Sequence, residues 1–148
     1  RHRIASFNQQ SQRYVKFTGE VAVVKPESVA DNAAASEAFD KAIQAVVDAY
    51  HALLEAGVPA EDARYLLPNA AESKIVITMN VRELLHFFSL RCCNRAQWEI
   101  RDMAHRMLEL ARPTAPFIFA DAGAPCVRGT CPEGKMTCGN PYPKVTRE

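Results

Sequence analysis

The first fourteen residues, RHRIASFNQQSQRY, gather arginines and neutral polar side chains that could bind a small anion. Arg1, Arg3 and Arg13 are positively charged, and no acid precedes Glu20. A guanidinium holds phosphate or carboxylate because its planar fork donates two parallel hydrogen bonds. The serine, asparagine and glutamine side chains between the arginines add neutral donors and acceptors. The combination favours a phosphorylated small molecule with a polar ring, and a solvated basic chain end is the alternative.

A second cluster, NVRELLHFFSLR, begins at Asn80 and has helical spacing. Arg82 and His86 are four residues apart, so a helix would place them on one face. Asn80 can cap that helix, and a helix N-terminus attracts anions. The alternative is that Arg82 pairs with Glu83 or Glu99 and that His86 is a structural histidine.

Three cysteines, Cys126, Cys131 and Cys138, lie in a Gly- and Pro-rich segment with C-x4-C-x6-C spacing. Three thiols could hold a metal ion if a fourth ligand came from elsewhere. The spacing lacks the C-x-x-C pair that is typical of zinc sites, so we expect free thiols and no metal. The other two cysteines, Cys92 and Cys93, are adjacent in an expected helix.

The composition narrows the class of protein. The net charge of +1 over 148 residues argues against a general nucleic-acid or membrane-surface protein, so we expect neither partner. No apolar run is long enough for a transmembrane helix, and no secretory signal is visible, so a reducing cytoplasmic setting is expected. Neither a G-x-G-x-x-G nor a P-loop motif occurs, so a nucleotide cofactor would be held in another way.

The elements that must position these clusters follow from hydrophobic spacing and from Gly and Pro. The expected elements are a strand end passing into a loop over 1–14, a strand near 20–25, a helix over 33–56, a short helix from Pro59 to before Pro68, a buried strand over 72–80, and a helical stretch over 80–112 that breaks near 92–94. From Pro113 onward we expect irregular structure. Strands and long helices without regular alternation predict an α+β fold with a mixed or antiparallel sheet portion and long packed helices.

Three ordered motifs resemble the flavin-dependent thymidylate synthases. R-H-R, seven residues and then Ser11 is similar to the signature of that family, and S-x-N-x-x-S-x-R-Y overlaps it. An A-R-x-x-L-P element begins at Ala63, and N-x-R-E-L-x-H-F-F-x-L-R followed by A-Q-W-E-I-R begins at Asn80. The resemblance covers 1–101 and implies an α+β subunit of a homotetramer with active sites where subunits meet.

The resemblance implies reductive methylation of dUMP to dTMP. Methylene-tetrahydrofolate would supply the carbon, and FAD reduced by NADPH would supply the hydride. Two alternatives stay open. One is a related flavin enzyme that methylates UMP or another pyrimidine nucleotide, and the other is a non-catalytic nucleotide- or RNA-binding module.

The resemblance also implies roles for individual residues. Those expected to contact FAD are Arg1, His2, Arg3, Gln9, Asn80, Val81, Arg82 and His86. Those expected to bind dUMP are Gln9, Gln10, Ser11, Gln12, Arg13, Arg64 and Arg91. Arg91 is the expected catalytic residue, because a guanidinium can stabilise charge that develops on the uracil ring. Gln9 stands where many members have Glu, and Val81 replaces the usual Ala.

Two expectations concern the extent of the domain. Residues 1–120 are expected to be the C-terminal two-thirds of one such domain, and 121–148 an irregular Cys-, Gly- and Pro-rich tail. Members of the family carry a portion before R-H-R that adds FAD contacts and sheet. A chain that starts at R-H-R is therefore expected to bind poorly or to be inactive alone.

Overall fold

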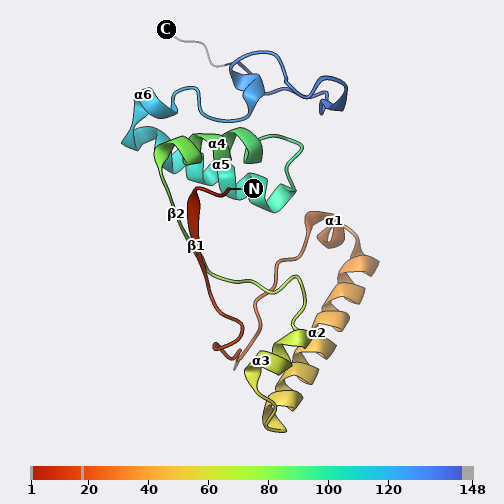
Figure 1. Ribbon diagram of the computed structural model, residues 1–148. Helices are drawn as coiled ribbons and strands as arrows, with labels where there is room; N and C mark the ends of the chain where they lie inside the picture. The colour runs from red at the N-terminus through yellow and green to blue at the C-terminus, as the bar shows by residue number, and fades with distance from the viewer. Residues whose placement is uncertain (1, 18, 145–148) are drawn as a thin grey trace. The chain divides into compact units, whose positions relative to one another are not determined.

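The structure is a computed structural model that describes residues 2–17 and 19–144. The chain forms two compact units (Figure 1). Unit 1 comprises Arg1–Ser6 and Ile77–Glu148, and unit 2 comprises Phe7–Val76. Unit 1 is therefore built from two segments that are distant in the sequence. Among the described residues, no helix is long and apolar enough to cross a membrane.

A two-stranded antiparallel sheet joins β1 (Ala5–Gln9) to β2 (Ile75–Met79). The predicted strand over 72–80 therefore exists, but the expectation that it is buried was wrong, since Val76 is 65% exposed. β2 has one neighbouring strand, and the described part of the chain leaves the Val76 side chain open to solvent. The strand expected near 20–25 is reduced to a single bridge between Val23 and Ala71, because the opposing segment stays alongside for only a few residues.

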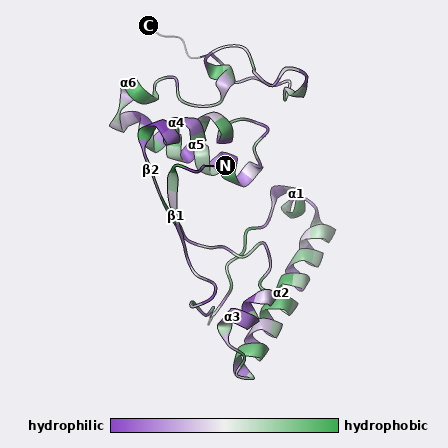
Figure 2. Ribbon diagram, in the orientation of Figure 1, coloured by the Kyte–Doolittle hydropathy of each residue, from purple (hydrophilic) through white to green (hydrophobic). Residues whose placement is uncertain are grey.

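Unit 2 is dominated by one long helix. Its elements are α1 (Glu27–Ala30), α2 (Ala33–Glu55), α3 (Ala60–Ala63) and the 3-10 turn η1 (Arg64–Leu66). The helix predicted over 33–56 is confirmed: Asn32 caps it by accepting from the amide of Ala35 at 3.1 Å. The helix ends at Glu55, and the φ of 85° at Gly57 permits the two closing bonds from Gly57 N to Leu54 O and from Val58 N to Leu53 O. Apolar and polar residues both occur along α2 (Figure 2), and Tyr50 is its fully buried residue.

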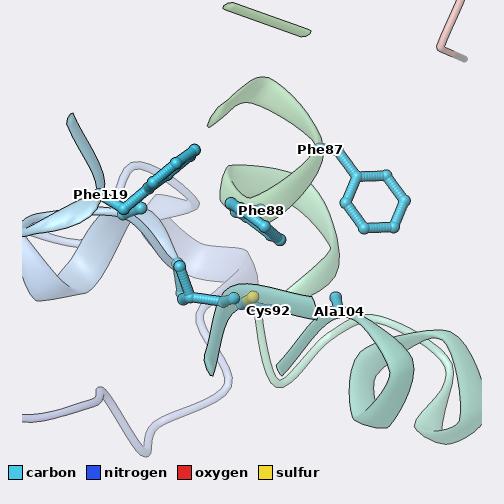
Figure 3. Packing of buried hydrophobic residues seen from close by; sticks show 8 residues of the cluster. Phe87, Phe88, Cys92, Ala104 and Phe119 are labelled. Carbon is cyan, nitrogen blue, oxygen red and sulfur yellow. The ribbon is translucent and has the colours of Figure 1, made fainter. Parts of the chain in front are cut away.

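Unit 1 contains the larger hydrophobic core. Its elements after β2 are α4 (Val81–Arg91), α5 (Trp98–Ala111), η2 (Arg112–Thr114), α6 (Pro116–Phe119), η3 (Pro125–Val127) and η4 (Gly134–Met136). The break predicted near 92–94 separates α4 from α5. Phe87 and Phe88 of α4 pack in this core with Ala104 of α5 and with Phe119 (Figure 3).

The fold class predicted from the sequence, α+β, is confirmed by these helices and the small antiparallel sheet. The segment after 120 does contribute to the core, because Ala122 and Ala124 are buried within it. The division of the chain at residue 120 stays a prediction.

Candidate functional site

His2 is the centre of a buried polar cluster in unit 1. Its Nδ1 lies 2.9 Å from Glu83 Oε1, and its Nε2 lies 3.2 Å from Arg91 Nε. The side chains of His2 and Glu83 are only 7% and 9% exposed. Because Arg91 Nε can only donate, Nε2 of His2 must accept, which assigns the ring proton to Nδ1 and directs it to Glu83.

Helix α4 positions these groups. Asn80 Oδ1 accepts from the backbone amide of Glu83 at 2.9 Å and fixes the first turn of the helix. Glu83, Phe87 and Arg91 follow one another at intervals of four, so they share a helix face. The His2 ring packs against the Phe87 ring at 5.1 Å, so the polar cluster rests directly on the hydrophobic core.

The guanidinium group of Arg91 is only partly hydrogen-bonded within the described part of the chain. Its Nε is bound to His2, and within the described part of the chain its two Nη groups have no hydrogen-bond partner. Arg91 also lines a cavity of about 820 Å³, together with Asn94, Arg95 and Tyr142. That volume lies within the range of small-molecule sites.

Several of the residues expected to contact flavin lie on the surface of unit 1, whereas His2 is buried and Gln9 belongs to unit 2. Arg3, Val81, Arg82 and His86 are exposed, and the His86 ring lies 5.8 Å from the His2 ring. Neither Arg3 nor Arg82 has an ion-pair partner among the described residues. The alternative pairing of Arg82 with Glu83 or Glu99 is therefore wrong, because the Glu83 carboxylate turns inward to His2. Arg1 lies outside the described residues.

The loop expected to bind dUMP belongs to unit 2 and is organised around Ser11. Ser11 Oγ accepts from the amides of Arg13 and Tyr14 at 3.2 and 3.3 Å, which makes the loop turn. The Ser11 hydroxyl oxygen thus shapes the loop, and the expected role of Ser11 in binding dUMP stays a prediction. Gln9 Nε2 donates to Ser73 Oγ at 2.7 Å, so Gln9 is already partnered.

Glu61 contacts the two arginines of unit 2 that are expected to bind dUMP. Arg13 Nε donates to Glu61 Oε2 at 2.6 Å, and Arg64 Nε donates to the backbone oxygen of Glu61 at 2.9 Å. Each guanidinium also lies over the ring of the following tyrosine, at 5.1 Å for Tyr14 and 5.8 Å for Tyr65. The structure thus groups the predicted residues into two sets, one within each unit.

Sequence reasoning missed Glu83 and Glu61 as members of these sets. A signal was available for Glu83: N-x-x-E is the spacing of a capping box, in which the glutamate should bond back to the cap residue. A bond to a residue 81 positions away cannot be read from local spacing. Glu61 carried no signal beyond its place in the first turn of α3.

His2, Glu83 and His86 also form a group whose ligand atoms lie within 4.8 Å of one another. Two histidines and a carboxylate can hold a divalent transition metal. The Arg91 guanidinium touches His2 Nε2, however, and its positive charge opposes a cation there. Among the described residues, the tail cysteines do not form such a group.

Cys92 lies in the hydrophobic core of unit 1, directly after the last residue of α4. Burial raises the pKa of its thiol from 9.0 to about 11, and the Arg112 guanidinium offsets only part of that effect. Cys92 is therefore an inert member of the core, whereas Cys93 is partly exposed and lines the cavity beside Arg91.

Comparison with known proteins gives a consistent result. The family model described as thymidylate synthase complementing protein matches residues 1–117. The flavin-dependent thymidylate synthase of Geobacter sulfurreducens is 61% identical over 140 residues, which are 94% of this chain and 60% of that protein. The proteins of the same name from Nitratidesulfovibrio vulgaris and Clostridium tetani are 55% and 46% identical, over 97% and 94% of this chain and 62% of each relative. The chain thus spans about three-fifths of the length of these curated relatives, and it belongs to the thymidylate synthase complementing protein family.

Proposed function

We propose that the protein takes part in the flavin-dependent reductive methylation of dUMP to dTMP, with methylene-tetrahydrofolate as carbon donor and NADPH as reductant. Membership of the family and the names of the relatives support the reaction. The observation that carries the proposal is Arg91, which lines a cavity and is bound to His2 through Nε, while its two Nη groups have no hydrogen-bond partner among the described residues.

The exposed residues around His2 suit FAD. Arg3 and Arg82 offer two guanidinium groups without acidic partners among the described residues, and these match the charge of a diphosphate. His86 and Val81 offer a ring donor and an apolar contact for the rest of the cofactor. When bound, the flavin supplies the hydride, while the protein supplies position and charge.

Arg91 acts on the uracil ring of dUMP. Its guanidinium stays protonated, so the open Nη edge can donate to a ring carbonyl and stabilise negative charge as the proton between the two carbonyls is lost. The bond to His2 fixes the direction of that edge before the substrate arrives. Such preorganisation costs no reorganisation at the moment of reaction.

The Ser11 turn in unit 2 holds the nucleotide phosphate. Arg13 and Arg64 are kept near each other by Glu61, and the Arg13–Glu61 pair is exposed to solvent. A phosphate dianion can replace the Glu61 carboxylate as the partner of Arg13, because two oxygens of either group can accept the parallel N–H bonds of a guanidinium. Glu61 thus keeps Arg13 in place until the phosphate binds.

Assembly into a homotetramer is part of the proposal. Large apolar side chains on the surface, among them Ile4, Phe7, Val76 and Phe117, support contacts with further copies of the chain. All five cysteines are free thiols, which supports work in the reducing cytoplasm.

The test uses the purified full-length protein with dUMP labelled with tritium at the methyl-accepting carbon. Wild-type protein should show flavin absorbance and should release tritium when given NADPH and methylene-tetrahydrofolate, whereas Arg91→Ala should keep the flavin and lose the release. Protein that carries no flavin would rule the proposal out. Competition between dUMP and UMP in a binding titration separates the related UMP-methylating activity, because a site built for one hydroxyl pattern rejects the other.

A further inference from the structure

We propose that Glu83 is a positioning residue that fixes the tautomer of His2 and thereby holds Arg91 in its active orientation. The inference rests on the proposed function for its effect on turnover. The arrangement of the three side chains is independent of that function.

The burial of Glu83 is the first reason. Its side chain is 9% exposed, although it lies in the first turn of α4, where an acid normally faces solvent and the helix N-terminus. Burying a carboxylate is costly unless a partner compensates. Among the described residues that partner is His2 Nδ1, at 2.9 Å. A glutamate that only stabilised the helix would reach back to Asn80 or to water.

The chemistry of the His2 ring is the second reason. A neutral imidazole has one N–H and one lone pair, and Arg91 needs the lone pair at Nε2. Glu83 selects the tautomer that provides it, because a carboxylate accepts from Nδ1–H and repels a lone pair at that position. Without Glu83 the ring can place its proton on Nε2, where it would face the Arg91 N–H as a second donor.

The position of the cluster is the third reason. His2 is clamped between Glu83 on one side and Arg91 on the other, and its ring rests on Phe87. Arg91 is half-buried and lines the cavity, so a change in its anchor changes the direction of its open edge. Misorientation of such a group by a fraction of an ångström is enough to slow a reaction.

The experiment compares Glu83→Leu with Glu83→Gln in the flavin-loaded protein. The leucine removes the acceptor and keeps the volume approximately, whereas the glutamine keeps an acceptor oxygen without the charge. Glu109→Leu is the matched control, because Glu109 is exposed on α5 and lies outside the cluster. Thermal unfolding identifies any variant that does not fold, and Glu83→Gln keeps the test valid if the leucine variant fails.

The kinetic readout is the split between kcat and KM. We expect Glu83→Leu to lower kcat on the order of 10- to 100-fold, the usual cost of losing a group that orients another, with a smaller change in KM for dUMP. Glu83→Gln should recover most of the loss, and Glu109→Leu should match wild type. In an Arg91→Ala background, Glu83→Leu should have almost no further effect on kcat, because the two residues act as one unit.

The spectroscopic readout does not depend on activity. With 15N-labelled histidine, the ring nitrogens of His2 should report the Nδ1–H tautomer in wild type and in Glu83→Gln, and a mixture or the Nε2–H tautomer in Glu83→Leu. The His2→Gln variant identifies the signal. An unchanged tautomer, or additive effects of Glu83→Leu and Arg91→Ala, would overturn the inference. If wild type makes no dTMP but the tautomer shifts as expected, the proposed function fails while the role of Glu83 in holding His2 stands.

Discussion

The candidate residues of the two units are held in opposite ways. In unit 1 the His2 and Glu83 side chains are 7% and 9% exposed, and His2 rests on the aromatic core of α4. In unit 2 the Arg13 and Glu61 side chains are 54% and 45% exposed, and an ion pair at the surface joins them. An exposed pair of this kind contributes about 0.2–1 kcal/mol.

We propose from this difference that the two units have different tasks. A group locked against a core keeps its direction without a ligand, which suits a residue that must stabilise a transition state. A group held by an exchangeable ion pair can release its partner when a phosphate arrives, which suits binding. The following predictions test this contrast between a preformed unit 1 and an adaptable unit 2, from the largest expected effect to the smallest.

Phe88→Ala should lower the free energy of unfolding by about 3–5 kcal/mol, because it empties a fully buried aromatic site in the core of unit 1. Urea unfolding followed by circular dichroism measures the change. Glu109→Ala is the control, since Glu109 is exposed on α5 and its loss should cost less than about 0.5 kcal/mol. A small effect for Phe88 would mean that unit 1 is not the rigid support that we describe.

Arg91→Ala should lower kcat by about 10²- to 10³-fold, the usual effect of removing one preorganised donor. Arg91→Lys should not restore it, because an ammonium lacks the Nε–H for His2 and the two Nη groups. Arg13→Ala in unit 2 should act mainly on KM for dUMP. Arg106→Ala, at an exposed pair with Asp102 on α5, serves as the control. Similar losses of kcat in Arg13→Ala and Arg91→Ala would contradict the proposed difference between the two units.

Cys92 and Cys138 should differ strongly in reactivity. Burial raises the pKa of Cys92 from 9.0 to about 11, and each unit lowers the thiolate fraction tenfold, so at pH 8 that fraction is about 100-fold smaller than for an ordinary thiol. Alkylation followed by mass spectrometry should label exposed Cys138 quickly and Cys92 only in denaturant. Fast labelling of Cys92 in the native protein would show that the core of unit 1 opens readily.

Asn80→Ala and Asn32→Ala should each lower the free energy of unfolding by about 1 kcal/mol, because each side chain caps a helix. The effects of these two substitutions on flavin binding should differ. Asn80→Ala should also weaken flavin binding, since Asn80 fixes the turn that carries Glu83, whereas Asn32→Ala in unit 2 should leave it unchanged. A titration of flavin absorbance against added FAD measures this, and equal effects of the two changes would contradict the assignment of the flavin site to unit 1.

Glu61→Gln should change the free energy of unfolding by less than about 1 kcal/mol, and high salt should abolish the difference, because the pair with Arg13 is exposed and screened. Thermal unfolding of both proteins at low and at high salt measures this difference in stability. A loss above about 2 kcal/mol would mean that the Ser11 loop is rigid without its ligand.

Local patterns predicted local structure well. The Asn80 cap, the end of the helix over 33–56 before Gly57 and the break between α4 and α5 follow from spacing, capping and glycine. The exposure of β2 was not predictable, because a run of β-branched residues does not reveal how many strands or layers lie beside it.

The sequence motifs singled out some residues of the candidate site, missed Glu83 and Glu61, and did not indicate which side chains touch. The motifs pointed to His2 and Arg91 separately, one as a flavin contact and one as a catalytic group. Their bond joins residues 89 positions apart, and the role of Glu83 depends on the same long-range contact. Side-chain contacts between distant segments follow from tertiary packing, which one sequence does not encode in any local spacing.

Unit 1 is built from two segments that are distant in the sequence, and this affects how fast it reaches its folded, active structure. The whole of unit 2 lies in sequence between His2 and Glu83. Closing so long a loop carries an entropic cost, and non-local contacts of this kind slow folding. During synthesis, residues 2–6 emerge before α4, which they must contact. We expect the contacts of His2 with Glu83 and Arg91 to form late, so the onset of turnover would report completed folding of unit 1.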